Sequence, residues 1–194
     1  MNPRTDADRL PDDAGAILLP LARAAIARDL DLPAPPVAES PTDTSWLDVP
    51  GASFVTLHRA GRLRGCIGSL EAYRPLRTDV EANARSAAFR DPRFSPLTPP
   101  ELAEVRIEVS VLSAPVRLPV SAEAEVRAAL RPGVDGVVLE HRGRRGTFLP
   151  QVWAQLPDPA TFLDHLRAKA VLPEGFWDDE TVVSTYTVTS WEES

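Results

Sequence analysis

The sequence has few of the residues that form covalent or metal cross-links. Its 194 residues include one cysteine and three histidines. A single cysteine cannot form an internal disulfide, and no Cys/His spacing matches that of a structural zinc site. The chain is long enough to fold around its own apolar core without such cross-links. The sequence therefore indicates no metal and no cofactor, and a reducing cytosol suits it best.

Long apolar runs and a basic N-terminus are missing as well. No apolar run reaches the roughly 18 residues that a transmembrane helix needs. Four of the first 13 residues are aspartates, whereas a secretory signal would begin with basic residues. The net charge of −7 argues against general binding to nucleic-acid backbones, which requires a basic face. We therefore expect a cytoplasmic protein with no membrane or nucleic-acid partner, in which any anion site is local.

Hydrophobic periodicity predicts an α+β fold with a mixed or antiparallel sheet flanked by helices. Helices are expected over residues 13–30, 75–89, 121–130 and 161–170, and strands over 53–57, 63–67, 105–112, 136–140, 146–149 and 181–188. Strand and helix do not alternate strictly, which argues against a doubly wound sheet. The only linker-like stretch is the proline-rich segment 33–44, so residues 1–194 are expected to form one domain.

Details at the helix ends are also predicted. An aspartate near Asp13 is expected to cap the first helix, and Pro20 to kink that helix or delay its start. Thr161 is expected to cap the last helix, with Asp164 three residues on.

The predicted strand around the only cysteine is the first candidate for a functional site. It has the sequence Leu63-Arg64-Gly65-Cys66-Ile67-Gly68. Cys66 is the only soft nucleophile in the chain, and Arg64 can favour a thiolate or hold an anion. The flanking glycines would let a ligand or another backbone approach the strand closely. The alternative is that Cys66 packs as a small hydrophobe and the glycines mark only a bulge.

Two further pairs of residues have both a functional and a structural interpretation. His165 and Lys169 lie four apart on a predicted helix, so they share a face and can supply a base and a cation to one pocket. Alternatively, they flank the buried row of that helix at the water edge. Asp91 and Arg93 either hold a loop through an ion pair or line a cleft. Asn83 can orient a substrate, although a structural hydrogen bond is favoured.

The remaining polar features carry weaker signals. The basic turn Arg142-Gly143-Arg144-Arg145-Gly146 can bind a phosphate or carboxylate, or can be a solvated hairpin tip. His58 and His141 lie at predicted strand ends and are expected to be exposed. The chain contains no P-loop, no G-x-G-x-x-G, no H-E-x-x-H and no G-x-S-x-G. Nucleotide-binding, zinc-protease and serine-hydrolase functions therefore have no motif to support them.

Three groups of residues, taken in order, resemble the AMMECR domain family. They are Leu63 to Gly68, then Asp91-Pro92-Arg93-Phe94 with Pro96-Leu97-Thr98, then Phe148-Leu149-Pro150-Gln151-Val152-Trp153. The bacterial and archaeal form is called AmmeMemoRadiSam system protein A. The resemblance covers nearly the whole chain, and it implies two interlocked subdomains with the cysteine hairpin facing a cleft between them. It also implies a Memo-like protein and a radical SAM protein as candidate partners.

The resemblance carries a set of cleft residues over to this chain: Arg64, Gly65, Cys66, Asp91, Arg93, Gln151, His165 and Lys169. One hypothesis is an enzyme that acts on a small anionic substrate, with Cys66 as nucleophile and His165 as base. In this hypothesis Arg64 and Lys169 bind the anionic group. The other hypothesis is a regulatory or adaptor module without catalysis, which binds a Memo-like or radical SAM partner through the same cleft. The sequence leaves both open.

Overall fold

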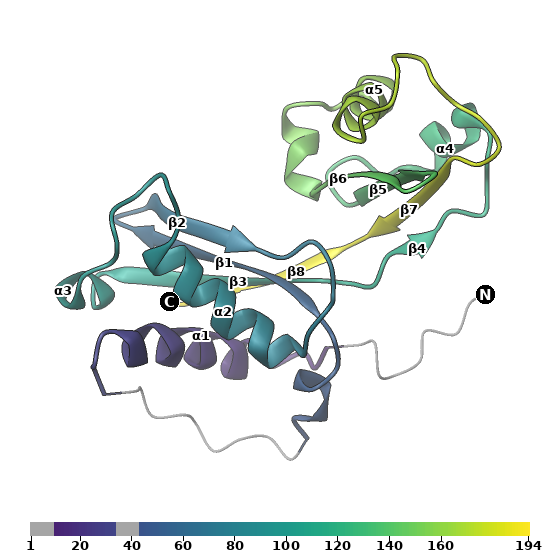
Figure 1. Cartoon of the computed structure of the whole chain (residues 1–194). Helices are drawn as coiled ribbons and strands as arrows, with labels where there is room; N and C mark the ends of the chain where they lie inside the picture. Colours follow the sequence, from purple (N-terminus) through teal and green to yellow (C-terminus); the bar gives the residue numbers. More distant parts are fainter. Residues whose placement is uncertain (1–9, 34–42) are drawn as a thin grey trace. The chain divides into compact units, whose positions relative to one another are not determined.

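A computed structural model describes residues 10–33 and 43–194. The chain divides into two compact units, Met1–Leu112 with Thr189–Ser194, and Ser113–Val188. Each unit combines helices with a four-stranded sheet, and the predicted α+β class is confirmed (Figure 1). The proline-rich connection predicted at 33–44 falls mainly on residues outside the described ranges.

The first unit is a sheet with two helices packed against it. Its strands are β1 (Ala52–Arg59), β2 (Arg62–Gly68), β3 (Val105–Leu112) and β8 (Val188–Glu192), in the order β2-β1-β3-β8. The helices α1 (Gly15–Asp29) and α2 (Leu76–Phe89) lie on the same side of this sheet (Figure 1). The short helices η2 (Ser45–Leu47) and α3 (Pro99–Leu102) complete the unit.

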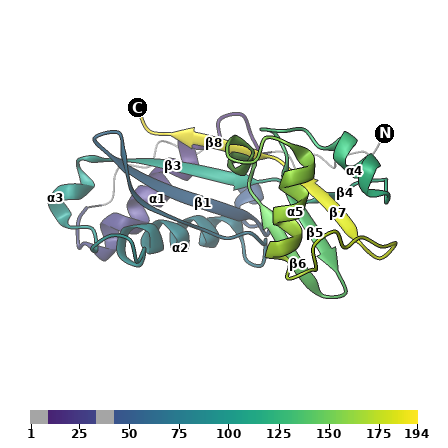
Figure 2. The ribbon, with the colours of Figure 1, turned by 90° about the horizontal axis from the view of Figure 1, so that it is seen from above.

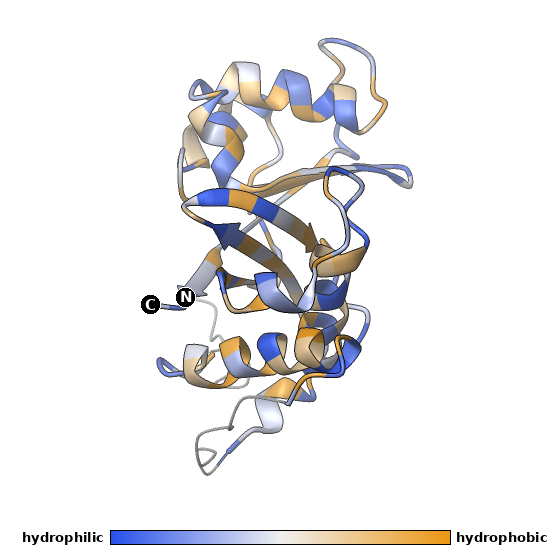
Figure 3. Ribbon diagram, turned by 90° about the vertical axis from the view of Figure 1, so that its left-hand side faces the viewer, coloured by the Kyte–Doolittle hydropathy of each residue, from blue (hydrophilic) through white to orange (hydrophobic). Residues whose placement is uncertain are grey.

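Alternation along the strands builds the core of this unit. Val55 and Leu57 of β1 and Ile107 and Val109 of β3 are fully buried in one cluster with the helices. The intervening strand residues face the other side of the sheet, because successive side chains of a strand point to opposite faces. Polar and apolar residues accordingly alternate along the strands in Figure 3. One face of this sheet is therefore packed, and the other carries the polar side chains.

The second unit places a helix over a smaller sheet. Its strands are β4 (Val116–Arg117), β5 (Gly136–His141), β6 (Arg144–Phe148) and β7 (Val182–Tyr186), in the order β4-β7-β5-β6. Its helices are α4 (Glu123–Ala129), η3 (Pro150–Ala154) and α5 (Pro159–Lys169), and α5 crosses β5 and β6 (Figure 2). Trp153 stacks on Phe162 with ring centroids 3.7 Å apart, which anchors α5 in the apolar core.

Several predicted details were wrong. α1 begins at Gly15 behind Ala14, which makes no side-chain cap, and Pro20 lies within the helix without delaying its start. Asp158 caps α5 in place of Thr161, whose backbone N–H and hydroxyl both donate to the Asp158 carboxylate. The strand predicted at 181–188 corresponds to β7, but β8, which begins at Val188 and joins the sheet of the first unit, was not predicted.

None of the helices within the described ranges is long and apolar enough to cross a membrane.

Gly65 is the point where β2 touches α2. A Cβ atom at this position would lie 2.2 Å from the carbonyl oxygen of Ala87. Two backbones therefore meet here, which is one of the two close approaches that the strand glycines predicted. Because the neighbour is a helix backbone, it cannot rotate away from an added methyl group.

We expect Gly65→Ala to lower the free energy of unfolding by about 1–3 kcal/mol, the usual cost of overpacking a core. Urea unfolding measures this loss. The control is Gly61→Asn in the β1–β2 turn, where no heavy atom lies within 4 Å and asparagine tolerates the positive φ of 73°. Equal losses in the two variants would contradict this account of Gly65.

Candidate functional site

Cys66 lies on the face of β2 that points away from α2. Gly65 faces the helix, so alternation turns the next side chain to the opposite face. Cys66 as a whole residue is partly buried. Thr56, its cross-strand neighbour on β1, donates a hydrogen bond from its hydroxyl to the sulfur at 3.3 Å. The sulfur is thus held by a polar partner from the neighbouring strand.

Asp91 and Arg93 fix the loop after α2 onto the cysteine strand. The Asp91 carboxylate accepts hydrogen bonds from the Cys66 backbone N–H at 2.9 Å and from Arg93 Nη2 at 2.7 Å. The Arg93 guanidinium holds the pKa of Asp91 well below its usual range. The side chain of Arg93 is 53% exposed, and its Nη2 lies 3.4 Å from the Cys66 carbonyl oxygen. An ion pair therefore holds this loop, and it leaves a solvent-facing cation beside the cysteine.

Arg64 is committed to internal partners. A register shift in the pairing of β1 with β2 leaves it without a cross-strand partner. Its guanidinium is buried and donates to the Glu101 carboxylate and to the Ser95 carbonyl oxygen. The hydrogen bond from Arg64 lowers the pKa of Glu101 to about 2. In these contacts Arg64 ties α3 and the preceding loop to β2.

The other predicted site residues belong to the second unit. Gln151 lies exposed in η3, and His165 and Lys169 lie exposed on α5. The Lys169 ammonium lies 4.9 Å from the centroid of the Phe148 ring. The two α5 residues flank the buried row of their helix, as the structural interpretation predicted; the row is Phe162, Leu166 and Ala170. The structure thus brings Cys66, Asp91 and Arg93 together in the first unit and places the predicted base in the second.

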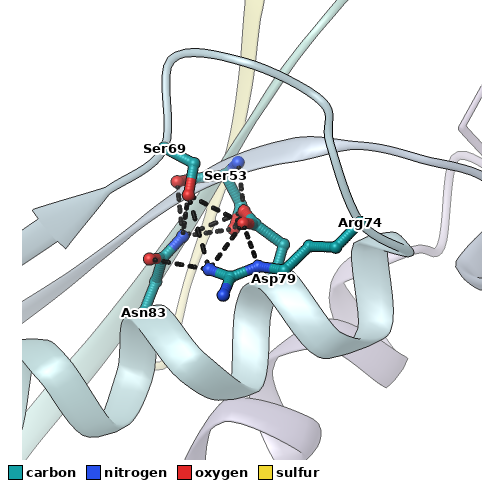
Figure 4. Close-up of polar contacts among 5 residues, drawn as sticks. All are labelled: Ser53, Ser69, Arg74, Asp79 and Asn83. Atoms are coloured by element: carbon teal, nitrogen blue, oxygen red, sulfur yellow. Dashed lines mark hydrogen bonds and ion pairs between the residues drawn. The ribbon is translucent and has the colours of Figure 1, made fainter.

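A buried carboxylate that the sequence analysis did not single out lies at the centre of a polar cluster in the first unit (Figure 4). Asp79, on the first turns of α2, is fully buried. One of its oxygens accepts hydrogen bonds from the backbone N–H and hydroxyl of Ser53, at 2.8 and 2.6 Å, and from Asn83 at 2.9 Å. The other accepts from Ser69 at 2.7 Å and from Arg74 Nε at 2.8 Å. Asp79 therefore joins β1, α2 and the loop that follows β2.

Three members of the Asp79 cluster, Ser69, Arg74 and Asn83, line an open groove of about 860 Å³. The groove runs between the end of α1, the outer face of α2 and the end of the cysteine hairpin at Gly68 and Ser69. Its charged lining consists of Arg28, Arg74, Arg85 and Arg90 with Asp29 and Asp31. Even with Asp79 included, four guanidinium groups face three carboxylates. The groove is therefore locally cationic in a chain whose net charge is −7.

The sequence contained one partial signal for this cluster. Asn83 borders the apolar stripe of α2, and a buried amide must find partners. Its amide nitrogen donates to the Ser53 carbonyl oxygen at 2.9 Å, which is the structural hydrogen bond that was favoured. Asp79 lies four residues earlier and therefore on the same face of the helix. An acidic residue in the first turns of a helix is common on exposed surfaces, so its burial had no signature of its own.

Comparisons with known proteins agree in pointing to one family. The model of the AMMECR1 family matches residues 19–191. A protein of Methanothermobacter thermautotrophicus is 45% identical over 132 residues, which cover 67% of this chain and 69% of the relative. A protein of Thermofilum pendens is 38% identical over 185 residues, with 87% and 84% covered. The crystal structure of an uncharacterised protein from Pyrococcus horikoshii superposes with a TM-score of 0.73 at 34% identity, over 95% of this chain and 94% of that one.

The lowered pKa of Glu101 makes a prediction about acid stability. A carboxylate whose pKa is 4.5 when unfolded and about 2 when folded stabilises the fold above pH 4.5, and this stabilisation is lost as the pH falls to 2. We therefore expect Glu101→Gln to be less stable than the natural protein at pH 6, and the gap to narrow steadily from about pH 4.5 downward. Urea unfolding at stepped pH measures the gap. Glu104→Gln, at a more exposed ion pair with Arg59, is the control. A gap for Glu101→Gln that stays constant with pH would contradict the prediction.

Proposed function

This chain belongs to the AMMECR1 family, and within that family we propose that its first unit binds a small anionic ligand in the arginine-lined groove at the end of the cysteine hairpin. The observation that carries the proposal is the groove itself. Its size lies within the range of small-molecule sites, which is about 300–1,000 Å³. Its lining is charged, whereas a site for an apolar ligand would be lined mainly by apolar side chains.

The arginines of the groove differ in how free they are to bind a ligand. Arg74, which lines the groove, is held at 2.8 Å by the buried Asp79. Arg85 lies 3.5 Å from Asp29 in a partly exposed pair, which an incoming anion can replace. Arg28 and Arg90 are exposed, and the described residues show no ion pair to either. These two guanidinium groups are therefore the natural first contacts for a phosphate or carboxylate, which arginine binds in bidentate geometry.

The second candidate function is thiol chemistry at Cys66. It is favoured by the hydrogen bond from Thr56 to the sulfur and by the Arg93 cation beside the same strand. These are the polar and charged groups that substrate chemistry at the sulfur would have beside it. In this candidate His165 would act as base, and Lys169 and Gln151 would contact substrate, as the family resemblance implies. The resemblance also supports the alternative of a regulatory or adaptor role toward a Memo-like or radical SAM partner.

Binding of pyrophosphate and of citrate tests the groove. At fixed ionic strength, we expect one of these anions to bind saturably by isothermal titration calorimetry. The double variant Arg28→Gln/Arg90→Gln is expected to weaken that affinity at least tenfold, because each charge-assisted hydrogen bond contributes about 1.5–3 kcal/mol. The matched control is Arg62→Gln, which removes an exposed positive charge from the hairpin but does not line the groove.

Cys66→Ser separates the two candidate functions in the same assay. The groove proposal expects this variant to bind the anion with unchanged affinity, because Cys66 does not line the groove. If the double arginine variant binds as well as the natural protein, the groove proposal is wrong. If affinity falls only in Cys66→Ser, the anion binds at the thiol.

A further inference from the structure

Three side chains able to bind a metal gather at one end of the second unit. His141 is the last residue of β5, and Asp178 and Glu180 lie in the loop that precedes β7. One donor atom of each lies within 4.8 Å of the other two. Donor atoms that share a tetrahedral zinc ion at about 2.0–2.2 Å lie roughly 3.3–3.6 Å apart. Side-chain movements of about an ångström would therefore bring all three donors to one ion.

His141 contributes the observation that points to a ligand. It was expected to be exposed, but only 8% of its side chain is accessible. Its Nδ1 is buried and makes no hydrogen bond with any described residue. A buried polar atom without a partner is costly, so such atoms are rare in folded proteins. This nitrogen faces the acidic loop and lies 3.2 Å from Asp178 Oδ1.

The relative placement of His141 Nδ1 and Asp178 Oδ1 suits a shared metal ion better than a hydrogen bond. At 3.2 Å the distance would allow a hydrogen bond, yet none forms, because the oxygen lies off the direction in which a ring N–H would point. Two donor atoms 3.2 Å apart that both bind a metal at about 2.1 Å each lie roughly 40° off the other's metal bond. A common metal position would place the two atoms in the same way.

The surrounding groups hold the carboxylates in place. Asp178 Oδ1 accepts hydrogen bonds from the Thr181 hydroxyl and from the Glu180 backbone N–H, both at 3.1 Å. Arg142 pairs with Glu180 and neutralises part of the negative charge. The ring of Phe176 packs edge-on against the imidazole with centroids 4.8 Å apart, which fixes the ring plane. Such outer contacts orient the ligands of metal sites and tune their affinity.

We propose that His141, Asp178 and Glu180 bind a divalent transition-metal ion. One imidazole and two carboxylates are a borderline-to-hard donor set, which suits Zn²⁺, Co²⁺ or Ni²⁺ better than the sulfur-seeking ions. Three protein ligands leave a fourth position for water or another ligand. His141 and Asp178 are 37 positions apart in the chain, so no short ligand-spacing motif in the sequence predicts the site. It does not depend on the groove of the first unit.

Titration with Zn²⁺ tests the site in the full chain carrying Cys66→Ser, which removes the only thiol. After treatment with a chelator, this protein is expected to bind one equivalent of Zn²⁺ by isothermal titration calorimetry. Asp178→Asn and Glu180→Gln are each expected to weaken the affinity at least tenfold. Glu180 is more than half exposed, so its variant tests the site without disturbing the core. His165→Ala, which removes an exposed histidine of the same unit, is the matched control and should bind Zn²⁺ normally.

Two results would overturn the proposal. One is the absence of saturable binding at one equivalent, which would leave His141 and Asp178 as an ordinary ion pair. The other is Zn²⁺ binding that survives unchanged in both carboxylate variants or that disappears in His165→Ala, because the ion would then bind elsewhere. Co²⁺ provides a second measurement: its visible spectrum should change on binding to the natural site and stay that of the free ion in Asp178→Asn.

Discussion

The buried charge of Asp79 is the constraint on which the first unit depends. A carboxylate removed from water is stable only if its oxygens are fully hydrogen-bonded. Here the donors come from β1, from α2 and from the loop after β2. The chain must bring all three segments to one point for the charge to be tolerated. The same requirement fixes the position of Arg74, which lines the groove.

The centre and the end of the cysteine strand, β2, have different surroundings. At its centre, Gly65 lets α2 approach, and Cys66 turns to the opposite face beside Thr56. At its end, Gly68 and Ser69 enter the groove that the Asp79 cluster supports. Close packing against α2 and hydrogen bonding to the Asp79 cluster therefore explain much of the sequence of this glycine-rich strand. They do not account for the thiol of the partly buried Cys66, the exposed Arg93 cation or the arginines of the groove.

The sequence predicted the regular parts of the fold well, because their signals are local. The strands expected over 53–57, 63–67 and 105–112 are present as β1, β2 and β3. The buried ionic groups had no such local signal. Aspartate and histidine side chains are usually exposed, and the burial of Asp79 and His141 is explained only by contacts with segments distant in the sequence. The strand β8 was missed for a similar reason, because it is distinguished from β7 by the sheet that it joins.

The free energy of unfolding of Asp79→Ala, measured with urea, tests the central role of this carboxylate most directly. Removing it leaves Arg74 and the buried N–H and hydroxyl of Ser53 without their acceptor, so a loss of about 3–5 kcal/mol is expected. Asp29→Ala, at a partly exposed ion pair with Arg85, should cost less than about 1 kcal/mol in the same experiment. A loss for Asp79→Ala no larger than that of Asp29→Ala would contradict the account, because the cluster would then contribute nothing to holding the three segments together.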